Sequence, residues 1–291
     1  MDKIVENLNK YLENSEQNMS SFGKSLILKG NYQNIEEDMN SGTFVKLDKL
    51  KLIKSYLSII PQFLLFKNII FKNLFIKKYK SICKKQHRLF NYDLIIHSIV
   101  LEMLNKKNLL NGNICIIGDG KGNFLHGVLD INNIKNIYSV NLPQSLIQDY
   151  LILKEYNSID NKLVKVVNEK KDLLDESCKI FLVPAENKKL LSKEKINLFI
   201  NMFSFQEMPL SETHEYIDVI LSNSAYLYSL NREEKIMLDG DKINYYDYGI
   251  KEKGKIIFEQ EAEFVKKYYN LKFPFIHKKE KKVISSLSSF A

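Results

Sequence analysis

Three glycines at alternate positions are the residues of this chain best suited to holding a small ligand. Gly118, Gly120 and Gly122 enclose Asp119 directly after a short apolar run, and Asn123 follows them. Glycine accepts unusual dihedral angles and lets the backbone approach a ligand closely. Asn123 breaks the GxGxxG fingerprint of dinucleotide sites, and the GxxxxGK[ST] pattern of a P-loop is absent. We therefore expect this GxGxG loop to bind a nucleotide-like cofactor; the alternative is a tight turn without a ligand.

Two further candidate positions follow later apolar runs, where the ribose and the base of a nucleotide would lie. Asn141, Leu142 and Pro143 stand about 20 residues after the glycines, where ribose-binding sheets usually carry an acidic residue. An amide also hydrogen-bonds hydroxyl groups, but more weakly than a carboxylate. Glu186 follows the third run, where contacts to the base are expected, and the alternative is a plain surface carboxylate.

The fourth apolar run breaks into polar residues at its end. Asn201 and Met202 close the run, and Gln206 and Glu207 follow shortly after it. Because the carboxyl ends of parallel strands meet at one edge of a sheet, we expect these residues to face the same crevice as the glycines. The alternative is a loop that begins a helix, with Ser211 as its N-cap.

Strands alternating with helices must position these residues. Apolar runs and helix-length segments alternate from residue 113 onward, which predicts a doubly wound, mostly parallel α/β sheet of Rossmann-like type. The expected strands cover residues 114–117, 137–140, 179–183, 197–202 and 225–230, and the expected helices cover 123–130, 144–156 and 212–222. Segments 255–259 and 268–273 are candidates for late strands that close the sheet, and 278–291 is expected to be a flexible tail.

The N-terminal part of the chain has a different texture. Residues 3–14 predict a first helix, and apolar residues recur at helical spacing between 46 and 110. We therefore predict a helical N-terminal cap over residues 1–110 and a Rossmann-like domain over 111–291. A chain of 291 residues can build such a core without disulfides or structural metals.

Charge and cysteine content narrow the class of partner. The formal net charge is +8, and residues 44–85 hold 11 lysines against one aspartate. This lysine-rich segment is either a solvated helical face or a docking surface for an anionic substrate or membrane. Only Arg88 and Arg232 are arginines, which argues against sequence-reading nucleic-acid recognition.

Cysteine spacing and the N-terminal sequence bear on metal binding and location. The three cysteines are far apart and show no zinc spacing, so we expect no metal site. No signal peptide and no uncharged run of about 20 residues is present, which favours a cytoplasmic protein, with peripheral membrane contact left open. Oligomeric state is not predicted by the sequence.

At these residues the chain resembles a known family. The GxGxG loop resembles motif I of class I S-adenosylmethionine-dependent methyltransferases, and the wider pattern resembles the sugar O-methyltransferases encoded with bacterial surface-polysaccharide genes. The matching pieces are Ile117–Gly122, Val140–Pro143, Asn201–Met208 with Tyr216, and Tyr226–Asn231. They span roughly residues 90–235, and the Asn-x-x-Ser-x-Gln-Glu-Met run is the most specific of them. The family usually has Asp-Leu-Pro at its second strand, so Asn141 is a departure.

The resemblance implies S-adenosylmethionine as methyl donor and a hydroxyl of a sugar or capsule precursor as acceptor. The residues expected at the cofactor are Gly118, Asp119, Gly120, Gly122, Asn123, Asn141, Leu142, Pro143, Glu186, Asn201 and Met202. Methyl transfer to a hydroxyl needs a group that removes its proton. We expect His214 to be this base and Glu207 to bind the acceptor, while His126 is a third candidate that is more consistent with a structural role.

Other functions remain open from the sequence alone. An NAD-dependent oxidoreductase is opposed by Asn123 and by the missing acid at Asn141. A non-catalytic or nucleic-acid-binding relative is favoured by the lysine-rich segment and opposed by the scarcity of arginine. A phosphoramidate-type acceptor would suit the basic N-terminal cap. The partner we expect is a small molecule or glycan precursor rather than nucleic acid.

Overall fold

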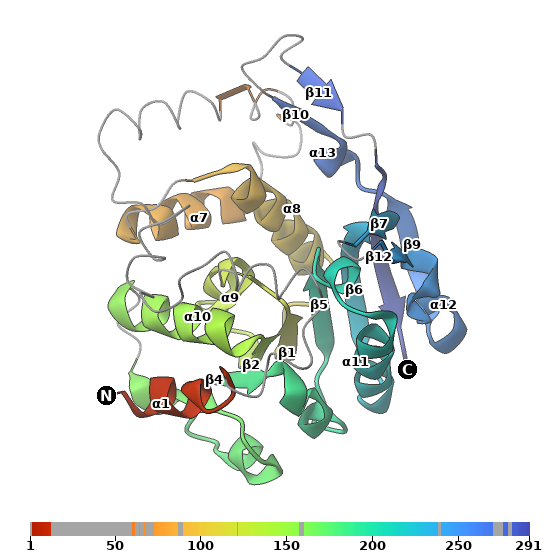
Figure 1. Cartoon of the computed structure of the whole chain (residues 1–291). Helices are drawn as coiled ribbons and strands as arrows, with labels where there is room; N and C mark the ends of the chain where they lie inside the picture. The colour runs from red at the N-terminus through yellow and green to blue at the C-terminus, as the bar shows by residue number, and fades with distance from the viewer. Residues whose placement is uncertain are drawn as a thin grey trace.

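The computed structural model describes most of the chain. The described residues are 2–12, 60–61, 64, 67, 73–86, 90–120, 122–156, 160–237, 240–269, 276–278 and 281–291. Within them, eight strands form one central sheet in the order β3-β4-β2-β1-β5-β6-β12-β9 (Figure 1). The strands are β1 (Gly112–Ile117), β2 (Ile134–Asn141), β3 (Val164–Val166), β4 (Ile180–Pro184), β5 (Leu198–Met202), β6 (Tyr226–Arg232), β9 (Lys255–Glu261) and β12 (Val283–Ser289).

The sheet is mostly parallel, which confirms the predicted fold class. β1 pairs in parallel with β2 on one side and with β5 on the other, and β4 and β6 extend the sheet in parallel beyond them. β12 lies between β6 and β9 and is antiparallel to both. Because the chain order reverses at β1, the carboxyl ends of β1, β2 and β5 border the crevice where such sheets bind ligands.

Alternate residues of the strands feed two separate cores. In β1, Ile114 and Ile116 belong to one buried cluster, whereas Cys115 and Ile117 belong to the other. This division arises because successive side chains along a strand point to opposite faces of the sheet. Both faces are therefore covered, as the near-continuous apolar runs of a parallel sheet require.

Helices cover the two faces unequally. One core is closed by residues of α1 (Lys3–Asn9), α7 (Leu74–Lys85), α8 (Tyr92–Lys106), α9 (Asn123–Val128) and α10 (Pro143–Tyr156). The other is closed by α11 (Leu210–Ser222), α12 (Ile250–Lys253) and the 3-10 turn η7 (Tyr245–Tyr248). The remaining turns are η3 (Asn161–Leu163), η4 (Lys170–Leu174), η5 (Ala185–Leu191) and η6 (Phe205–Glu207).

The described N-terminal helices pack on the sheet's own core. A Cβ placed on Gly127 of α9 would lie 2.2 Å from the Tyr79 hydroxyl of α7 and 2.7 Å from Leu101 of α8. Only a glycine therefore allows α7 and α8 to approach α9 this closely. The boundary at residue 110 between cap and domain stays a prediction, and much of the lysine-rich segment lies outside the described residues.

Three expectations about the elements need correction. The last residues form β12, a central strand, so the prediction of a flexible tail over 278–291 is wrong. The described start of segment 268–273 lies in β10 (Lys267–Tyr269), which pairs with β11 (Ile276–Lys278) instead of joining the sheet. Helix α1 ends at Asn9, earlier than expected. The small elements β7 (Glu234–Ile236), β8 (Lys242–Asn244) and α13 (Glu263–Lys266) complete the described chain.

Candidate active site

The glycine loop takes the backbone conformation that its sequence predicts. Gly118, Gly120 and Gly122 have φ angles of +68°, +71° and +62°, in the left-handed region. A Cβ on Gly118 would lie 2.0 Å from the Ser204 hydroxyl, so the loop touches the turn after β5. A Cβ on Gly120 would meet nothing within 4 Å. Gly118 is thus required by packing, whereas Gly120 borders open space.

Asp119 caps helix α9 from within the loop. Its carboxylate accepts hydrogen bonds from the backbone amides of Phe124 at 2.8 Å and Leu125 at 2.7 Å. His97 Nε2 of α8 lies 4.0 Å from the same carboxylate, whose side chain is 1% exposed. The capping commits Asp119 to the chain's own amides. Asn123 begins α9, and its carbonyl accepts a hydrogen bond from the Tyr79 hydroxyl at 2.9 Å.

The end of β2 carries polar groups that no other described residue pairs with. Asn141 is 8% exposed, and its Oδ1 accepts a hydrogen bond from the Leu142 amide at 2.9 Å. Its Nδ2 is buried and has no hydrogen-bond partner among the described residues, and the same holds for Oε1 of Gln144. Pro143 begins α10 and fixes the backbone between them. A donor and an acceptor are thus left open within one turn of chain, as a ligand with hydroxyl groups would require.

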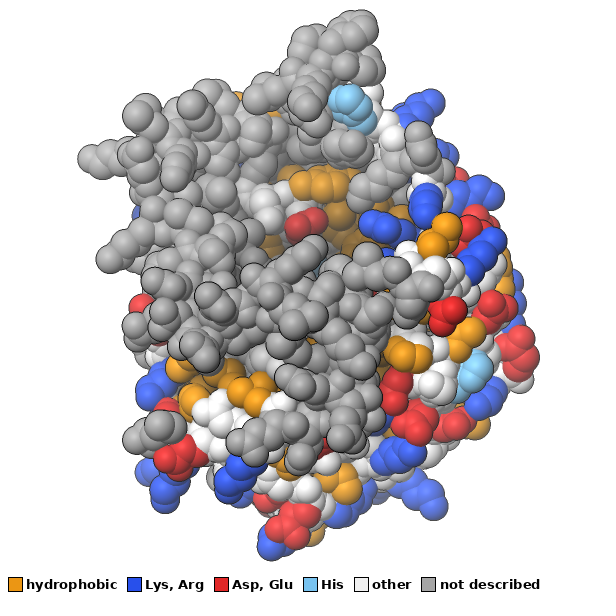
Figure 2. Space-filling view, in the orientation of Figure 1, with side chains coloured by type: hydrophobic (Ala, Val, Ile, Leu, Met, Phe, Trp, Pro, Cys, Tyr) orange, Lys and Arg blue, Asp and Glu red, His pale blue; other side chains and the backbone are white. Residues whose placement is uncertain are grey.

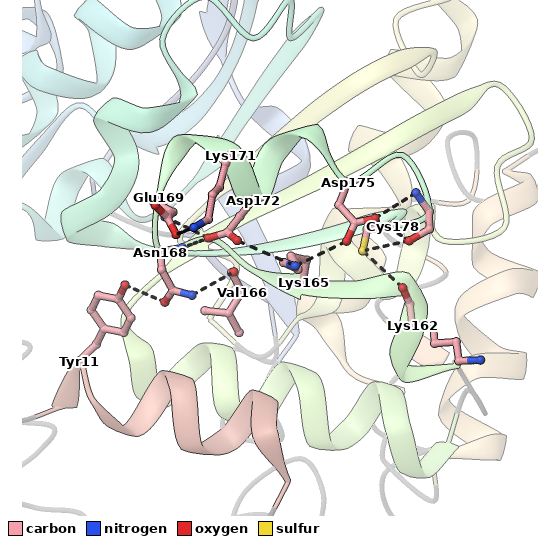
Figure 3. Close-up of polar contacts among 11 residues, drawn as sticks. Tyr11, Lys162, Lys165, Val166, Asn168, Glu169, Lys171, Asp172, Asp175 and Cys178 are labelled. Carbon is pink, nitrogen blue, oxygen red and sulfur yellow. Dashed lines mark hydrogen bonds and ion pairs between the residues drawn. The ribbon is translucent and has the colours of Figure 1, made fainter.

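Glu186 lies at the carboxyl end of β4 beside the N-terminal helix. It is exposed on η5, and partial burial raises the pKa of its carboxyl group. The neighbouring Asn187 donates a hydrogen bond to the Tyr11 hydroxyl at 3.0 Å. Tyr11 in turn donates to Asn168 Oδ1 at 2.9 Å (Figure 3). Burial raises the pKa of Tyr11, and the Glu186 carboxylate adds to the rise. Tyr11 therefore borders the place where the adenine base of the cofactor is expected.

The side-chain amide of Asn201 hydrogen-bonds to several of the segments that border the crevice. It is fully buried, and its Nδ2 donates to the Ile117 carbonyl at 3.2 Å and to Ser204 Oγ at 3.1 Å. Its Oδ1 accepts from the Phe205 amide at 3.2 Å and from Asn231 Nδ2 at 2.9 Å. With both of its polar atoms engaged inside the protein, Asn201 ties the ends of β1, β5 and β6 together.

Strain accompanies this network at the end of β5. Met202 is half-buried and is followed by Phe203, a non-glycine residue with φ of +61°. The Phe203 amide donates to the Leu230 carbonyl at 2.7 Å. A left-handed residue of this kind costs on the order of 1–2 kcal/mol and persists only where the surroundings impose it.

The proposed acid–base residues occupy three different environments. Glu207 is half-buried on η6, and its carboxylate pairs with the Lys235 ammonium at 2.8 Å. His214 is exposed on α11, and its Nε2 lies 2.8 Å from the Asp247 carbonyl of η7. If Nε2 carries the proton donated to that carbonyl, Nδ1 is left to accept another proton. His126 is 1% exposed and its Nδ1 lies 3.2 Å from Gln86 Nε2, an interior position.

The sequence reasoning missed three residues around this crevice. Gln144 and Tyr11 are described above, and the third is Asp149, a fully buried carboxyl on α10. Asp149 stands out in the sequence as the one acid amid apolar residues in the middle of a predicted helix. That signal, a charge on a buried helix face, was available before the structure.

No metal cluster accompanies these residues. Among the described residues, no group of three or more His, Cys, Asp or Glu is arranged to hold a metal ion. No helix within the described ranges is long and apolar enough to cross a membrane.

The arrangement is a Rossmann-like fold, in which helices cover both faces of a mostly parallel sheet. No protein-family model matches the chain, and no curated protein matches it. Solved structures resemble its fold at low identity. An S-adenosylmethionine-dependent methyltransferase from Clostridium acetobutylicum has 11% identity and a TM-score of 0.40, covering 66% of this chain and 89% of its own. A SAM-dependent methyltransferase from Aquifex aeolicus has 11% identity and a TM-score of 0.42, covering 65% of this chain and 89% of its own.

Proposed function

We propose that this protein binds S-adenosylmethionine and transfers its methyl group to a hydroxyl acceptor. The observation that carries the proposal is the pair of unpaired buried atoms, Asn141 Nδ2 and Gln144 Oε1, beside the left-handed glycine loop. Unpaired buried polar atoms are rare in folded proteins and call for a partner. They lie at the carboxyl end of β2, where sheets of this topology bind the ribose of a nucleotide-like cofactor.

The residues present fit such a cofactor. Each ribose hydroxyl can donate one hydrogen bond and accept others, so Gln144 Oε1 would accept from one hydroxyl and Asn141 Nδ2 would donate to the diol. The glycine loop would let the cofactor's amino-acid part approach the backbone near Gly120, where space is open. Glu186 and Tyr11 would border the adenine base of the cofactor. The bound cofactor supplies a methyl group already activated on a sulfonium.

We propose a sugar hydroxyl on a surface-polysaccharide or capsule precursor as the acceptor. The support is the resemblance of the Asn201–Met208 run to sugar O-methyltransferases. The pair formed by Glu207 and Lys235 would bind acceptor hydroxyls at the end of β5, because both side chains are charged and partly exposed. A phosphoramidate-type acceptor is a second candidate, for which Lys235 would supply the positive charge.

For the proton of the acceptor we propose His214 as base. The Asp247 carbonyl would orient its ring and leave Nδ1 as the accepting nitrogen. In an assay with a competent acceptor, His214→Ala is expected to lower kcat by about 10²- to 10⁴-fold. Glu207→Gln is expected to raise KM for the acceptor with a smaller change in kcat. Both variants retaining wild-type turnover would show that these roles are misassigned.

Ligand-induced stabilisation tests the cofactor assignment without an acceptor. S-adenosylhomocysteine at 100-fold excess over its Kd is expected to stabilise the wild-type protein by about 2.7 kcal/mol. Asn141→Leu should abolish most of this stabilisation, because the ribose loses its donor. Asn136→Leu, at the half-exposed opposite end of the same strand, is the matched control and should respond like the wild type. Stabilisation by NAD in place of S-adenosylhomocysteine would favour the oxidoreductase alternative.

A further inference from the structure

Asp149 is a buried acid without a hydrogen-bond partner in the described part of the chain. It lies in the second turn of α10 and is 0% exposed. Neither carboxyl oxygen has a hydrogen-bond partner among the described residues. Burial raises the pKa of this carboxyl well above its ordinary value, and the neighbouring Asp119 carboxylate raises it further. An ionised carboxylate in this position would cost several kcal/mol, so burial favours the neutral acid over the carboxylate.

The carboxyl is directed at the glycine loop. A Cβ on Gly122 would lie 2.8 Å from Asp149 Oδ1 and 3.1 Å from its Cγ. The same Cβ would lie 3.5 Å from His126 Cδ2 of α9. Asp149 therefore fills the space that any side chain at position 122 would need, directly against the glycine loop.

The groups around Asp149 do not neutralise it. The nearest backbone donors of α9, the amides of Phe124 and Leu125, already bond to Asp119. Among the described residues, the titratable groups shown to face it are the Asp119 carboxylate from the loop and the His126 ring from α9, with His97 of α8 beyond Asp119. Lys121 of the loop lies outside the described residues. No described side chain pairs with the Asp149 carboxyl itself.

We propose that Asp149 is the counter-charge for the α-ammonium group of the bound cofactor. The inference rests on the proposed function and assigns a residue to the amino-acid end of the same site. When the cofactor binds, Asp149 releases its proton to solvent and the resulting carboxylate pairs with the ammonium, which keeps its own protons. The only bond that breaks is the O–H bond of the Asp149 acid, and its proton leaves to solvent when the cofactor binds. Asp119 stays committed to capping α9.

Calorimetry with two ligands tests this role. S-adenosylhomocysteine contains the ammonium, whereas 5′-methylthioadenosine lacks the whole amino-acid end. For the wild type at pH 7, titration in buffers of different ionisation enthalpy should show proton release with S-adenosylhomocysteine and none with 5′-methylthioadenosine. Asp149→Asn should weaken S-adenosylhomocysteine at least tenfold, remove the proton release, and change 5′-methylthioadenosine affinity less than twofold. Asp218→Asn, which removes an exposed carboxylate of α11, should change none of these values.

The outcomes separate this inference from the proposed function. If the wild type binds both ligands without proton release, or if Asp149→Asn binds both as the wild type does, Asp149 is not the counter-charge. If neither ligand binds the wild type, the proposed function itself is wrong. Because proton release is measured on the intact wild-type protein, a variant that does not fold still leaves the inference decided.

Discussion

At the residue scale, one type of side chain, the asparagine amide, has two different roles at the crevice. Asn201 resembles a ligand-binding residue in the sequence, but its amide is spent on four hydrogen bonds inside the protein. Asn141, which departs from the family pattern, is the amide with a free donor. Residue type and position at a strand end therefore could not show which asparagine is available to a ligand. That availability depends on which hydrogen-bond partners the folded chain places around each amide.

The contact between Gly118 and Ser204 gives a prediction on stability. Gly118→Ala would place a methyl group 2.0 Å from Ser204 Oγ and 2.4 Å from its Cβ, at a φ of +68°. We expect a loss of about 2–5 kcal/mol, from a left-handed non-glycine residue and overpacking together. Gly120→Ala meets no neighbour and should lose about 1–2 kcal/mol from its φ alone.

Urea unfolding of both variants measures this difference. The double variant Gly118→Ala with Ser204→Gly removes the clashing atoms and should recover the overpacking part of the loss. Equal losses for the two single variants would contradict the account of the loop.

The buried Asp149 gives a prediction on pH dependence. Its pKa in the folded protein lies above the value of 3.8 that applies to the unfolded chain. The folded state therefore holds this proton more tightly, so its contribution to stability is complete below pH 3.8 and is lost as pH rises through the folded pKa. Asp149→Asn keeps the shape without the titration. The free energy of unfolding of the wild type, minus that of the variant, should fall with rising pH, and a difference that stays flat would contradict the burial of an unpaired acid.

At the element scale, most strands that could be predicted follow runs rich in apolar residues. The runs at β1, β2, β4, β5 and β6 were identified within about three residues, because both of their faces are buried. The predicted late strand over 255–259 is β9, at the edge of the sheet. β12 was missed because serines occupy many of its positions. Ser285, Ser286 and Ser288 are each at most 1% exposed, so this strand is buried although its composition is that of a loop.

Hydrogen bonds satisfy the buried hydroxyl groups of Ser285 and Ser286 but not that of Ser288, and this difference yields a matched pair of variants. Ser286 Oγ accepts from the Tyr245 hydroxyl at 2.6 Å, whereas Ser288 Oγ has no partner among the described residues. Ser286→Ala leaves a buried hydroxyl unpaired and should cost about 1–3 kcal/mol. Ser288→Ala removes an unpaired hydroxyl and should be neutral or stabilising. Thermal unfolding of both decides this, and an equal loss in the two variants would contradict the pairing.

At the scale of the whole molecule, the two hydrophobic cores cover the two faces of the sheet. The carboxyl ends of β1, β2 and β5 are left to border the candidate site. The charges on the described surface are largely paired: Lys189 bonds Glu215 at 2.6 Å, and Lys251 bonds Glu259 at 2.9 Å. Figure 2 shows lysines and carboxylates interspersed beside one another on the described face rather than gathered by sign. Within the described part of the chain, buried polar atoms without a hydrogen-bond partner include those of Asn141 and Gln144, at the end of β2, and of Asp149, against the glycine loop.

The central claim is that this crevice binds S-adenosylmethionine, and calorimetric titration with S-adenosylhomocysteine tests it most directly, with NAD as the control ligand. The account predicts one site per chain, micromolar affinity for S-adenosylhomocysteine, and no heat of binding with NAD. Binding of neither ligand by the folded protein would contradict it, since the open groups of Asn141 and Gln144 would then have no nucleotide to hold.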